Sequence, residues 1–175
     1  LNAVITGLQH LLTRMAGEDM ILTMDLAPQL PPVLADLGQM EQVAANLTLN
    51  ARDAMDGRGE VTFTTRAVSL RESMHAAAGE AGPGDYVELA VADRGHGISA
   101  PVLPHIFEPF FTTKDQGKGT GLGLSAVYGI VTGSGGHIIV ETAPGSGTVF
   151  RVRLPAAAPA APSAGASLPA TGSSS

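Results

Sequence analysis

The stretch Gly117-Lys-Gly-Thr-Gly-Leu-Gly123 runs straight into an expected helix and says most about the fold of this chain. Residues without side chains let consecutive backbone N–H groups point at one anion, and the N-terminus of the following helix adds its positive end. The only two lysines of the chain, Lys114 and Lys118, lie in or beside this stretch. These features favour a phosphate-binding loop over a plain flexible loop.

Two common phosphate-binding motifs do not fit this stretch. A Walker A loop needs Ser or Thr after its lysine and a glycine at its start, but here Gly119 follows Lys118 and Thr112 takes the place of the first glycine. The glycines of a Rossmann fold come directly after a strand, whereas a long irregular segment precedes Gly117. The sequence therefore predicts a different kind of nucleotide or phosphate site.

Outward from this stretch, hydrophobic periodicity predicts helices and strands that share one core. The expected helices cover residues 2–16, 38–56 and about 121–132, and the expected strands are Met20–Leu26, Glu60–Val68, Tyr86–Asp93, His137–Thr142 and Thr148–Leu154. Residues 69–85 and 94–120 are expected to be mostly irregular. This order predicts an α/β or α+β fold, in which helices cover one face of a mixed, mostly antiparallel sheet.

The composition limits the class of protein. The chain has 175 residues, of which 44% are hydrophobic and 15% charged, so it can bury one full core. Its net charge of −6 argues against nucleic-acid binding, because a phosphate-backbone binder normally has a basic surface. The absence of cysteine excludes disulfides, thiolate metal sites and a cysteine nucleophile. No apolar run approaches the roughly 20 residues of a membrane-spanning helix, so we expect no membrane contact.

The two ends of the chain suggest its domain organisation. Residues 155–175 are rich in Pro, Ala, Ser and Gly and carry no charge, which is typical of a flexible linker or tail. We expect one folded domain over residues 1–154, in which residues 1–16 are the end of a linker and the first helix. Since the chain begins with Leu1, we expect it to be a fragment of a longer protein.

The expected helix over residues 38–56 carries a polar stripe. Asn46 and Asn50 are four residues apart and so lie one turn apart on one face, and Gln42 and Asp53 extend that stripe. Asparagine is a mediocre helix former, and its amide oxygen is a hard ligand that suits Mg²⁺. The stripe is either a ligand-binding face or an ordinary solvated face.

The strand Tyr86–Asp93 ends in an acidic residue that faces inward. Val87, Leu89 and Val91 share one face, and the period of two places Asp93 on that same side. A buried carboxylate must be paired, because burying it bare costs several kcal/mol. The amino group of a purine would satisfy it, and turn amides of the chain itself are the alternative.

Three aromatic residues lie in the segment Ile106-Phe-Glu-Pro-Phe-Phe-Thr-Thr113. They precede a polar segment at about residues 112–120, for which we expect a mobile lid. The aromatic residues are either ordinary core residues or a latch that anchors this lid.

The order of these motifs resembles the catalytic ATP-binding domain of sensor histidine kinases, the Bergerat or GHKL fold. Asn46-Leu-Thr-Leu-Asn-Ala-Arg-Asp-Ala-Met55 is similar to the N box, Asp93-Arg-Gly-His-Gly97 to the G1 box, Phe107-Glu-Pro-Phe-Phe111 to the F box and Gly119-Thr-Gly-Leu-Gly123 to the G2 box. Gly145-Ser-Gly-Thr-Val-Phe150 is similar to the terminal glycine hairpin. The resemblance covers residues 1–154 and is greatest to hybrid kinases of the CckA type.

The resemblance implies roles for individual residues. Asn50 would bind Mg²⁺, Asn46 would support the phosphates, Asp93 would accept a hydrogen bond from the adenine amino group, and Thr148 would reach the adenine through a water. Other members carry a positively charged residue three positions after the magnesium Asn. That position is Asp53 here, so Arg52, Lys114 or Lys118 must supply the positive charge. The implied nucleotide contacts are Asn46, Asn50, Asp53, Asp93, Gly95, Gly97, Ile98, Lys114, Lys118, Gly119, Thr120, Gly121, Leu122, Gly123, Leu124 and Thr148, with Asn46, Asn50 and Lys118 as the catalytic residues.

The same resemblance bears on the reaction. Hydrolytic relatives place a Glu four residues before the magnesium Asn to activate water, but here that position is Asn46, whose amide cannot act as a base. The nucleophile in this family is instead a histidine. None of the five histidines, His10, His75, His96, His105 and His137, lies in the sequence context of a phosphoacceptor.

We therefore expect a histidine kinase domain that binds ATP (or ADP) with Mg²⁺ and transfers the γ-phosphate to a histidine of a separate dimerisation domain. A nucleotide-sensing module without kinase activity and a GHKL-type ATPase are the alternatives. The expected partners are the dimerisation and receiver domains of a homodimeric parent protein, with the fragment itself monomeric. The expected location is the cytoplasmic side of a bacterium, and an inner-membrane anchor of the parent stays open.

Overall fold

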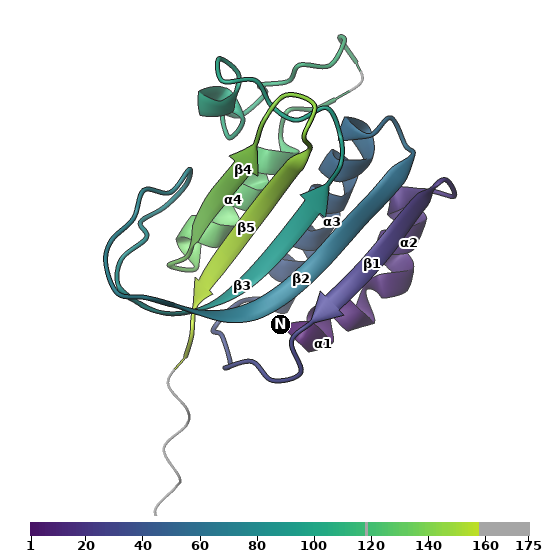
Figure 1. Cartoon of the computed structure of the whole chain (residues 1–175). Helices are drawn as coiled ribbons and strands as arrows, with labels where there is room; N and C mark the ends of the chain where they lie inside the picture. Colours follow the sequence, from purple (N-terminus) through teal and green to yellow (C-terminus); the bar gives the residue numbers. More distant parts are fainter. Residues whose placement is uncertain (118, 158–175) are drawn as a thin grey trace, which may run out of the picture.

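The strands form one mixed sheet in a computed structural model that describes residues 1–117 and 119–157. They are β1 (Met20–Leu26), β2 (Gly59–Leu70), β3 (Gly84–Asp93), β4 (His137–Thr142) and β5 (Thr148–Pro155). Across the described part of the sheet their order is β1-β2-β3-β5-β4, and β1 and β2 alone run parallel (Figure 1). The parallel pair arises because helix α3 (Leu37–Ala54) crosses over between these two strands.

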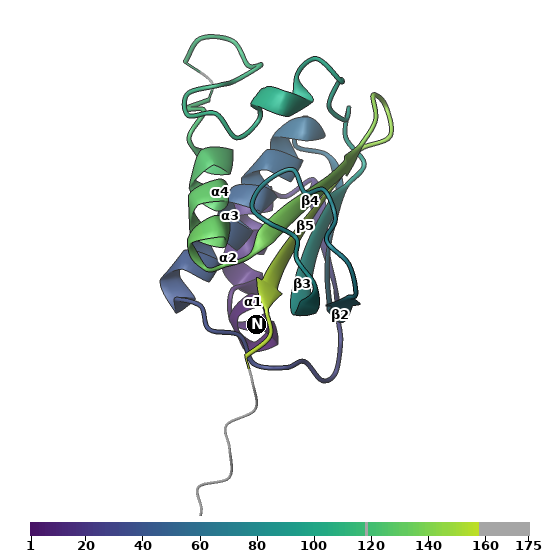
Figure 2. The ribbon, with the colours of Figure 1, turned by 90° about the vertical axis from the view of Figure 1, so that its left-hand side faces the viewer.

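The helices lie on one face of this sheet. α1 (Asn2–Gly7), α2 (Gln9–Ala16), α3 and α4 (Gly123–Gly133) form a single layer beside the strands, as Figure 2 shows edge-on. The predicted two-layer α+β architecture is thus confirmed. No helix in the described ranges combines the length and apolar character that crossing a membrane requires.

The N-terminal helix differs from the prediction. The periodicity predicts one helix over residues 2–16, but the structure has two, joined at Leu8. Gly7 is the last residue of α1, and glycine loses more backbone entropy in a helix than any other residue. Ile5, Leu8 and Leu12 stay buried, so the expected apolar stripe is kept across the break.

Helix α3 lies between α2 and α4 in this layer and packs on β2 and β3. The side chain of Asp36 caps its N-terminus by accepting a hydrogen bond of 2.9 Å from the backbone N–H of Gln39. Its apolar stripe is buried and packs on the inward residues of the sheet. The shared core includes Met40, Val43, Leu47, Ala51, Val61, Phe63, Val87, Leu89, Val91, Val127 and Val131.

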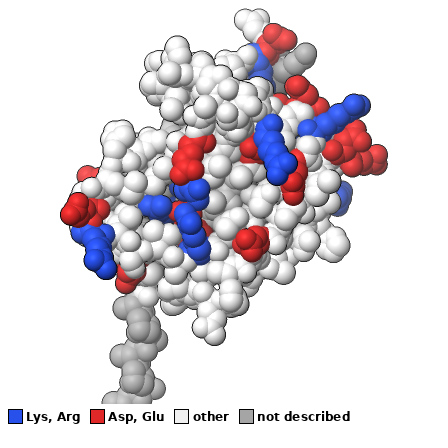
Figure 3. All heavy atoms as spheres, in the orientation of Figure 1, with Lys and Arg blue, Asp and Glu red and all other residues white. Residues whose placement is uncertain are grey.

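The other face of the sheet holds a buried carboxylate. The Glu88 side chain is 1% exposed, and its oxygens accept hydrogen bonds from Arg66, Arg151 and Arg153 on the neighbouring strands. Figure 3 views this face and shows acidic and basic side chains gathered over the strands. Burial by itself would raise the pKa of Glu88, but its bonds with Arg153 and Arg66 outweigh that effect and hold the pKa below its usual value.

The segment 71–83 covers part of this outer face. It folds back so that Met74 pairs with Ala81, and Ala78 pairs with Ile138 of β4. Within β3 and β4, the rings of Tyr86 and His137 meet edge to face at 4.8 Å. The prediction of an irregular loop over residues 69–85 is therefore too wide, because β2 runs on to Leu70 and β3 starts at Gly84.

The C-terminal end of the sheet reaches slightly beyond residue 154. β5 ends at Pro155, Ala156 pairs with Val33, and the Ala157 N–H donates to the Pro32 carbonyl at 2.7 Å. The linker or tail predicted for residues 155–175 otherwise lies outside the described residues.

Candidate nucleotide-binding site

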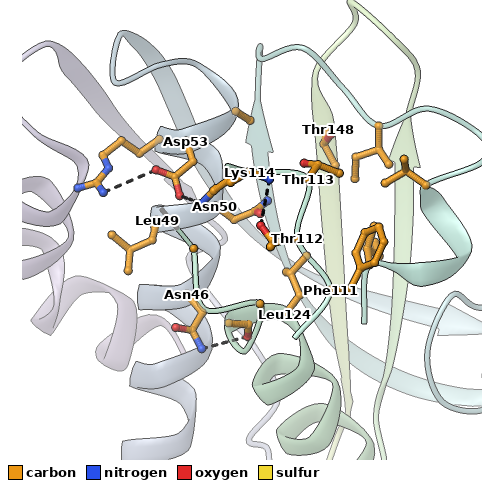
Figure 4. A pocket seen from close by; sticks show the side chains of 18 of the residues that line it. Asn46, Leu49, Asn50, Asp53, Phe111, Thr112, Thr113, Lys114, Leu124 and Thr148 are labelled. Atoms are coloured by element: carbon orange, nitrogen blue, oxygen red, sulfur yellow. Dashed lines mark hydrogen bonds and ion pairs between the residues drawn. The ribbon is translucent and has the colours of Figure 1, made fainter. Parts of the chain in front are cut away.

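A cavity of about 1000 Å³ opens at one end of the two layers. It lies between α3, the segment that follows β3, and the glycine-rich segment that begins α4 (Figure 4). Clefts of roughly 300–1,000 Å³ accommodate small molecules and cofactors. The volume of this cavity therefore suits a nucleotide.

Helix α3 contributes the polar stripe that its spacing predicts. Asn46, Asn50 and Asp53 line the cavity from successive turns. The Asn46 amide also donates a hydrogen bond of 3.2 Å to the Gly123 carbonyl, which ties α3 to the start of α4 (Figure 4). The stripe therefore faces a cavity, and ligand binding at this face stays a prediction.

Asp93 lies just behind the cavity rather than among the residues that line it. Its side chain is buried, and Oδ1 accepts hydrogen bonds from the backbone N–H of Gly95 at 2.9 Å and of Thr148 at 3.2 Å. Burial raises the pKa of the Asp93 carboxyl, and these two hydrogen bonds oppose that effect without cancelling it. Thr148 itself lines the cavity, so the Asp93 carboxylate is bonded to a residue of the cavity wall without being part of that wall.

Gly97 lines the cavity and also packs against the β4–β5 turn, a contact that the sequence does not predict. Its φ is +72°, and a Cβ there would lie 2.0 Å from the Ala143 carbonyl oxygen at the β4–β5 turn. The glycine therefore allows the segment after β3 to pack against that turn. The neighbouring Ile98 N–H donates to Thr142 at 2.9 Å, which fixes the same contact.

The glycine-rich segment forms the wall next to α4. All six residues from Gly119 to Leu124 line the cavity. Gly121 has a φ of +66° and its carbonyl accepts a hydrogen bond of 2.9 Å from the Phe110 N–H, so the segment is fastened to the aromatic residues before it. Lys118, which sequence analysis places among the catalytic residues, lies outside the described residues.

Arg52 and Lys114 both line the cavity near Asp53, but their side chains are held in different ways. Arg52 donates to the Met15 carbonyl at 3.0 Å and lies 3.6 Å from Asp53, so its guanidinium is held beside α2. Lys114 extends from the opposite side, and its ammonium contacts the Asp53 carboxylate (Figure 4). Of Arg52 and Lys114, the two candidate cations that the structure describes, Lys114 is the one that forms a bond across the cavity.

The cavity also has an apolar wall that the sequence analysis does not assign. Val102, Ile106 and Phe111 of the segment after β3 line it, and a flat ring system would bury apolar area against them. Leu49 of α3 adds an apolar side chain from the other side (Figure 4). The aromatic run before the lid is the only signal for this wall. Phe107 packs on the core and on Tyr128, whereas Phe110 is 74% exposed, so the run is neither purely core nor purely latch.

A magnesium ion in this cavity would need oxygen ligands. The described residues contain no group of three or more His, Asp or Glu side chains that could enclose a metal. Mg²⁺ commonly takes only one or two protein oxygens and completes its shell with phosphates and waters. Asn50 lines the cavity, and its amide oxygen is a ligand of the kind that Mg²⁺ accepts.

Comparison with known proteins names the class that this geometry defines. The profile of the family described as histidine kinase-, DNA gyrase B-, and HSP90-like ATPase matches residues 35–158. The chain belongs to this family of ATP-binding domains.

Its relatives include larger signalling proteins. The chain is 49% identical to the sensor kinase CckA of Brucella abortus (strain 2308), over 89% of this chain and 16% of that protein. It is 40% identical to the sensory histidine kinase/phosphatase NtrB of Rhodobacter capsulatus, over 81% of this chain and 38% of that protein. The chain thus spans well under half the length of either relative.

Solved structures show the same fold. Full-length ShkA in complex with AMPPNP superposes with a TM-score of 0.69 at 28% identity, covering 91% of this chain and 30% of ShkA. The catalytic domain of histidine kinase ThkA gives a TM-score of 0.62 at 29% identity, covering 89% of each chain. The predicted resemblance to histidine kinase catalytic domains is confirmed.

Proposed function

We propose that this chain is the ATP·Mg²⁺-binding catalytic domain of a hybrid sensor histidine kinase, and that it presents the γ-phosphate to a histidine on a separate dimerisation domain. One observation carries the proposal: Asn50, the segment 119–124 and Thr148 backed by Asp93 surround a single cavity. These groups come from distant parts of the sequence, and each supports a different part of a nucleotide.

Each group has a defined task in this proposal. The buried Asp93 carboxylate accepts from an adenine amino group, and the apolar wall covers the ring. Backbone N–H groups at the start of α4 bind phosphate oxygens. Asn50 would hold a magnesium ion, which would supply charge neutralisation for the transferred phosphoryl group. Phosphoryl transfer needs mainly this positioning and charge stabilisation.

Asn46 disfavours hydrolysis as the main reaction. It occupies the wall at the phosphate end, and its amide is engaged with Gly123, so it offers no base to activate water. An external imidazole from the dimerisation domain is therefore the proposed nucleophile. In the longer protein, this domain would work within a homodimer and pass the phosphoryl group on to a receiver domain.

Calorimetry with ADP tests the site. We expect Asn50→Ala to lose the gain in affinity that Mg²⁺ gives, while its affinity for ADP without Mg²⁺ stays close to that of the unchanged protein. We expect Asp93→Ala to lose affinity under both conditions. Unchanged affinity in both variants would refute the assignment.

Radiolabelled ATP tests the reaction. The chain joined to its dimerisation domain is expected to label a histidine, with an acid-labile and base-stable phosphoryl bond. Binding without any label would instead support a nucleotide-sensing module. Phosphate release by the isolated chain well above background would support an ATPase.

A further inference from the structure

An ion pair joins the lid segment to helix α3 across the end of the cavity. The ammonium of Lys114 contacts the carboxylate of Asp53, 61 residues away in the sequence. The side chains are 39% and 31% exposed, so the pair is half-buried at the edge of the site. It lies where the large cavity borders a smaller one of about 450 Å³, and both residues line the two cavities.

Contacts within the lid segment direct the Lys114 side chain toward α3. The Lys114 N–H donates to the Thr112 hydroxyl at 3.1 Å, which closes a tight turn. A Cβ on Gly119 would lie 3.0 Å from Lys114 Cδ and 3.2 Å from Thr112 Oγ1. The backbone at Gly119 therefore packs directly on the aliphatic part of the Lys114 side chain. Any residue larger than glycine at position 119 would press on that side chain.

Asp53 is at first sight misplaced in a site for a polyanion. It lies three residues after Asn50, so both face the cavity from the same side of α3. A carboxylate there repels phosphates unless a cation neutralises it. Arg52 lies 3.6 Å from Asp53 but is held by the Met15 carbonyl, whereas Lys114 contacts Asp53 from across the cavity. An ammonium has three donors, so one bond to Asp53 leaves two for phosphate oxygens.

We propose that Asp53 is a positioning residue, which holds the Lys114 ammonium at the phosphate end of the cavity and keeps the lid across it before nucleotide binds. The proposal rests on the proposed function, because it assigns Lys114 to the phosphates. Lys114 then contacts the nucleotide, whereas Asp53 acts through it.

Hydrogen exchange of the nucleotide-free chain tests the tether. We expect Asp53→Asn and Lys114→Met each to speed amide exchange in residues 110–117 a few-fold, as a half-exposed ion pair implies. The double variant should show no further increase, and Lys114→Arg should keep near-normal protection. Asp56→Asn is the matched control, since it removes the same charge from a residue that lines the same two cavities without a bond to Lys114 among the described contacts.

Unchanged exchange in Asp53→Asn, or an additive increase in the double variant, would overturn the tether. An increase of the same size in Asp56→Asn would also overturn it, because net charge alone would then account for the effect.

Calorimetry with Mg²⁺ and AMPPNP tests the role of the tether in binding. We expect Asp53→Asn to weaken binding several-fold when Lys114 is present and to have no weakening effect in the Lys114→Met background. A carboxylate that acts only by its charge would do the opposite, since its removal would tighten binding in both backgrounds.

The two proposals fail separately. If the unchanged chain binds no AMPPNP, the proposed function is wrong, and the exchange data alone judge the tether. If the unchanged chain binds AMPPNP but the coupling between Asp53 and Lys114 is absent, the positioning role is wrong and the proposed function stands.

Discussion

At the scale of single residues, Asp93 shows how burial and backbone hydrogen bonds act together on one carboxylate. Its Oδ1 is occupied by two backbone N–H groups, while burial raises the pKa of the carboxyl. The charged form is thus held at a cost that an added hydrogen-bond donor would reduce. An adenine amino group beside Thr148 is such a donor.

Asp93→Asn isolates this effect. The amide oxygen can still accept from Gly95 and Thr148, but the second oxygen becomes an NH₂ group that repels the adenine amino group. We expect affinity for ADP to fall about 10- to 100-fold, since a hydrogen bond to a charged group contributes about 1.5–3 kcal/mol. The melting temperature should change little, because a buried charge and a buried amide are both removed from water. Calorimetry and thermal unfolding measure the two quantities, and an unchanged affinity would contradict the assignment of Asp93 to adenine.

At the scale of elements, the glycine-rich segment depends on one backbone conformation. Gly121 has a φ of +66°, and a Cβ there would lie 2.4 Å from the backbone of Phe110. Any side chain would push the segment from the aromatic residues before it and move the N–H groups at the start of α4. Position 121 therefore requires glycine for both its conformation and its packing.

Gly121→Ala should lower nucleotide affinity at least tenfold while the melting temperature changes by only a few degrees, because lid segments open locally without unfolding the core. Gly129→Ala, in the helix α4 that follows this segment, is the control. Apart from its chain neighbours and the backbone of its own helix, no atom lies within 4 Å of the added Cβ, so it should raise stability by about 0.5–1 kcal/mol and leave affinity unchanged. Equal affinities of the two variants would show that the conformation at position 121 does not matter for binding.

Local pattern predicts some of these elements better than others. The spacing of Asn46 and Asn50 predicts their shared face, since helical geometry alone fixes it. The break at Leu8 escapes prediction, because the apolar stripe continues across it. The pairing of Lys114 with Asp53 also escapes prediction, since the path of a long irregular segment is set by contacts distant in sequence. The site is therefore predicted in its residue types but not in its bonds.

At the scale of the whole molecule, the outer face of the sheet departs most from the sequence pattern. Alternation places Val87, Leu89 and Val91 inside, which puts Glu88 on the opposite face, where a charged residue is expected to meet solvent. The structure buries Glu88 instead, because three arginines from β2 and β5 close around it and residues 71–83 fold over this face. No local signal predicts this burial, since it depends on the register of three strands.

This network predicts how the stability of the whole domain depends on pH. Glu88→Gln leaves the Arg153 guanidinium, 9% exposed, without its counter-ion, so we expect a loss of about 3 kcal/mol in the free energy of unfolding at pH 7. Because the pKa of Glu88 is lower in the folded state than its ordinary value of 4.5, its contribution is complete above that value and disappears as pH falls through the folded pKa.

Denaturant unfolding at several pH values measures the difference between the unchanged protein and Glu88→Gln. The difference should be constant near neutral pH and shrink below about pH 4.5. Glu141→Gln is the matched control: it removes a second carboxylate that Arg151 contacts, but its side chain is 55% exposed, so it should cost less than about 1 kcal/mol. A difference for Glu88→Gln that is as small as that of Glu141→Gln, or that grows on acidification, would show that the outer face is held by packing of residues 71–83 and not by the charge of Glu88.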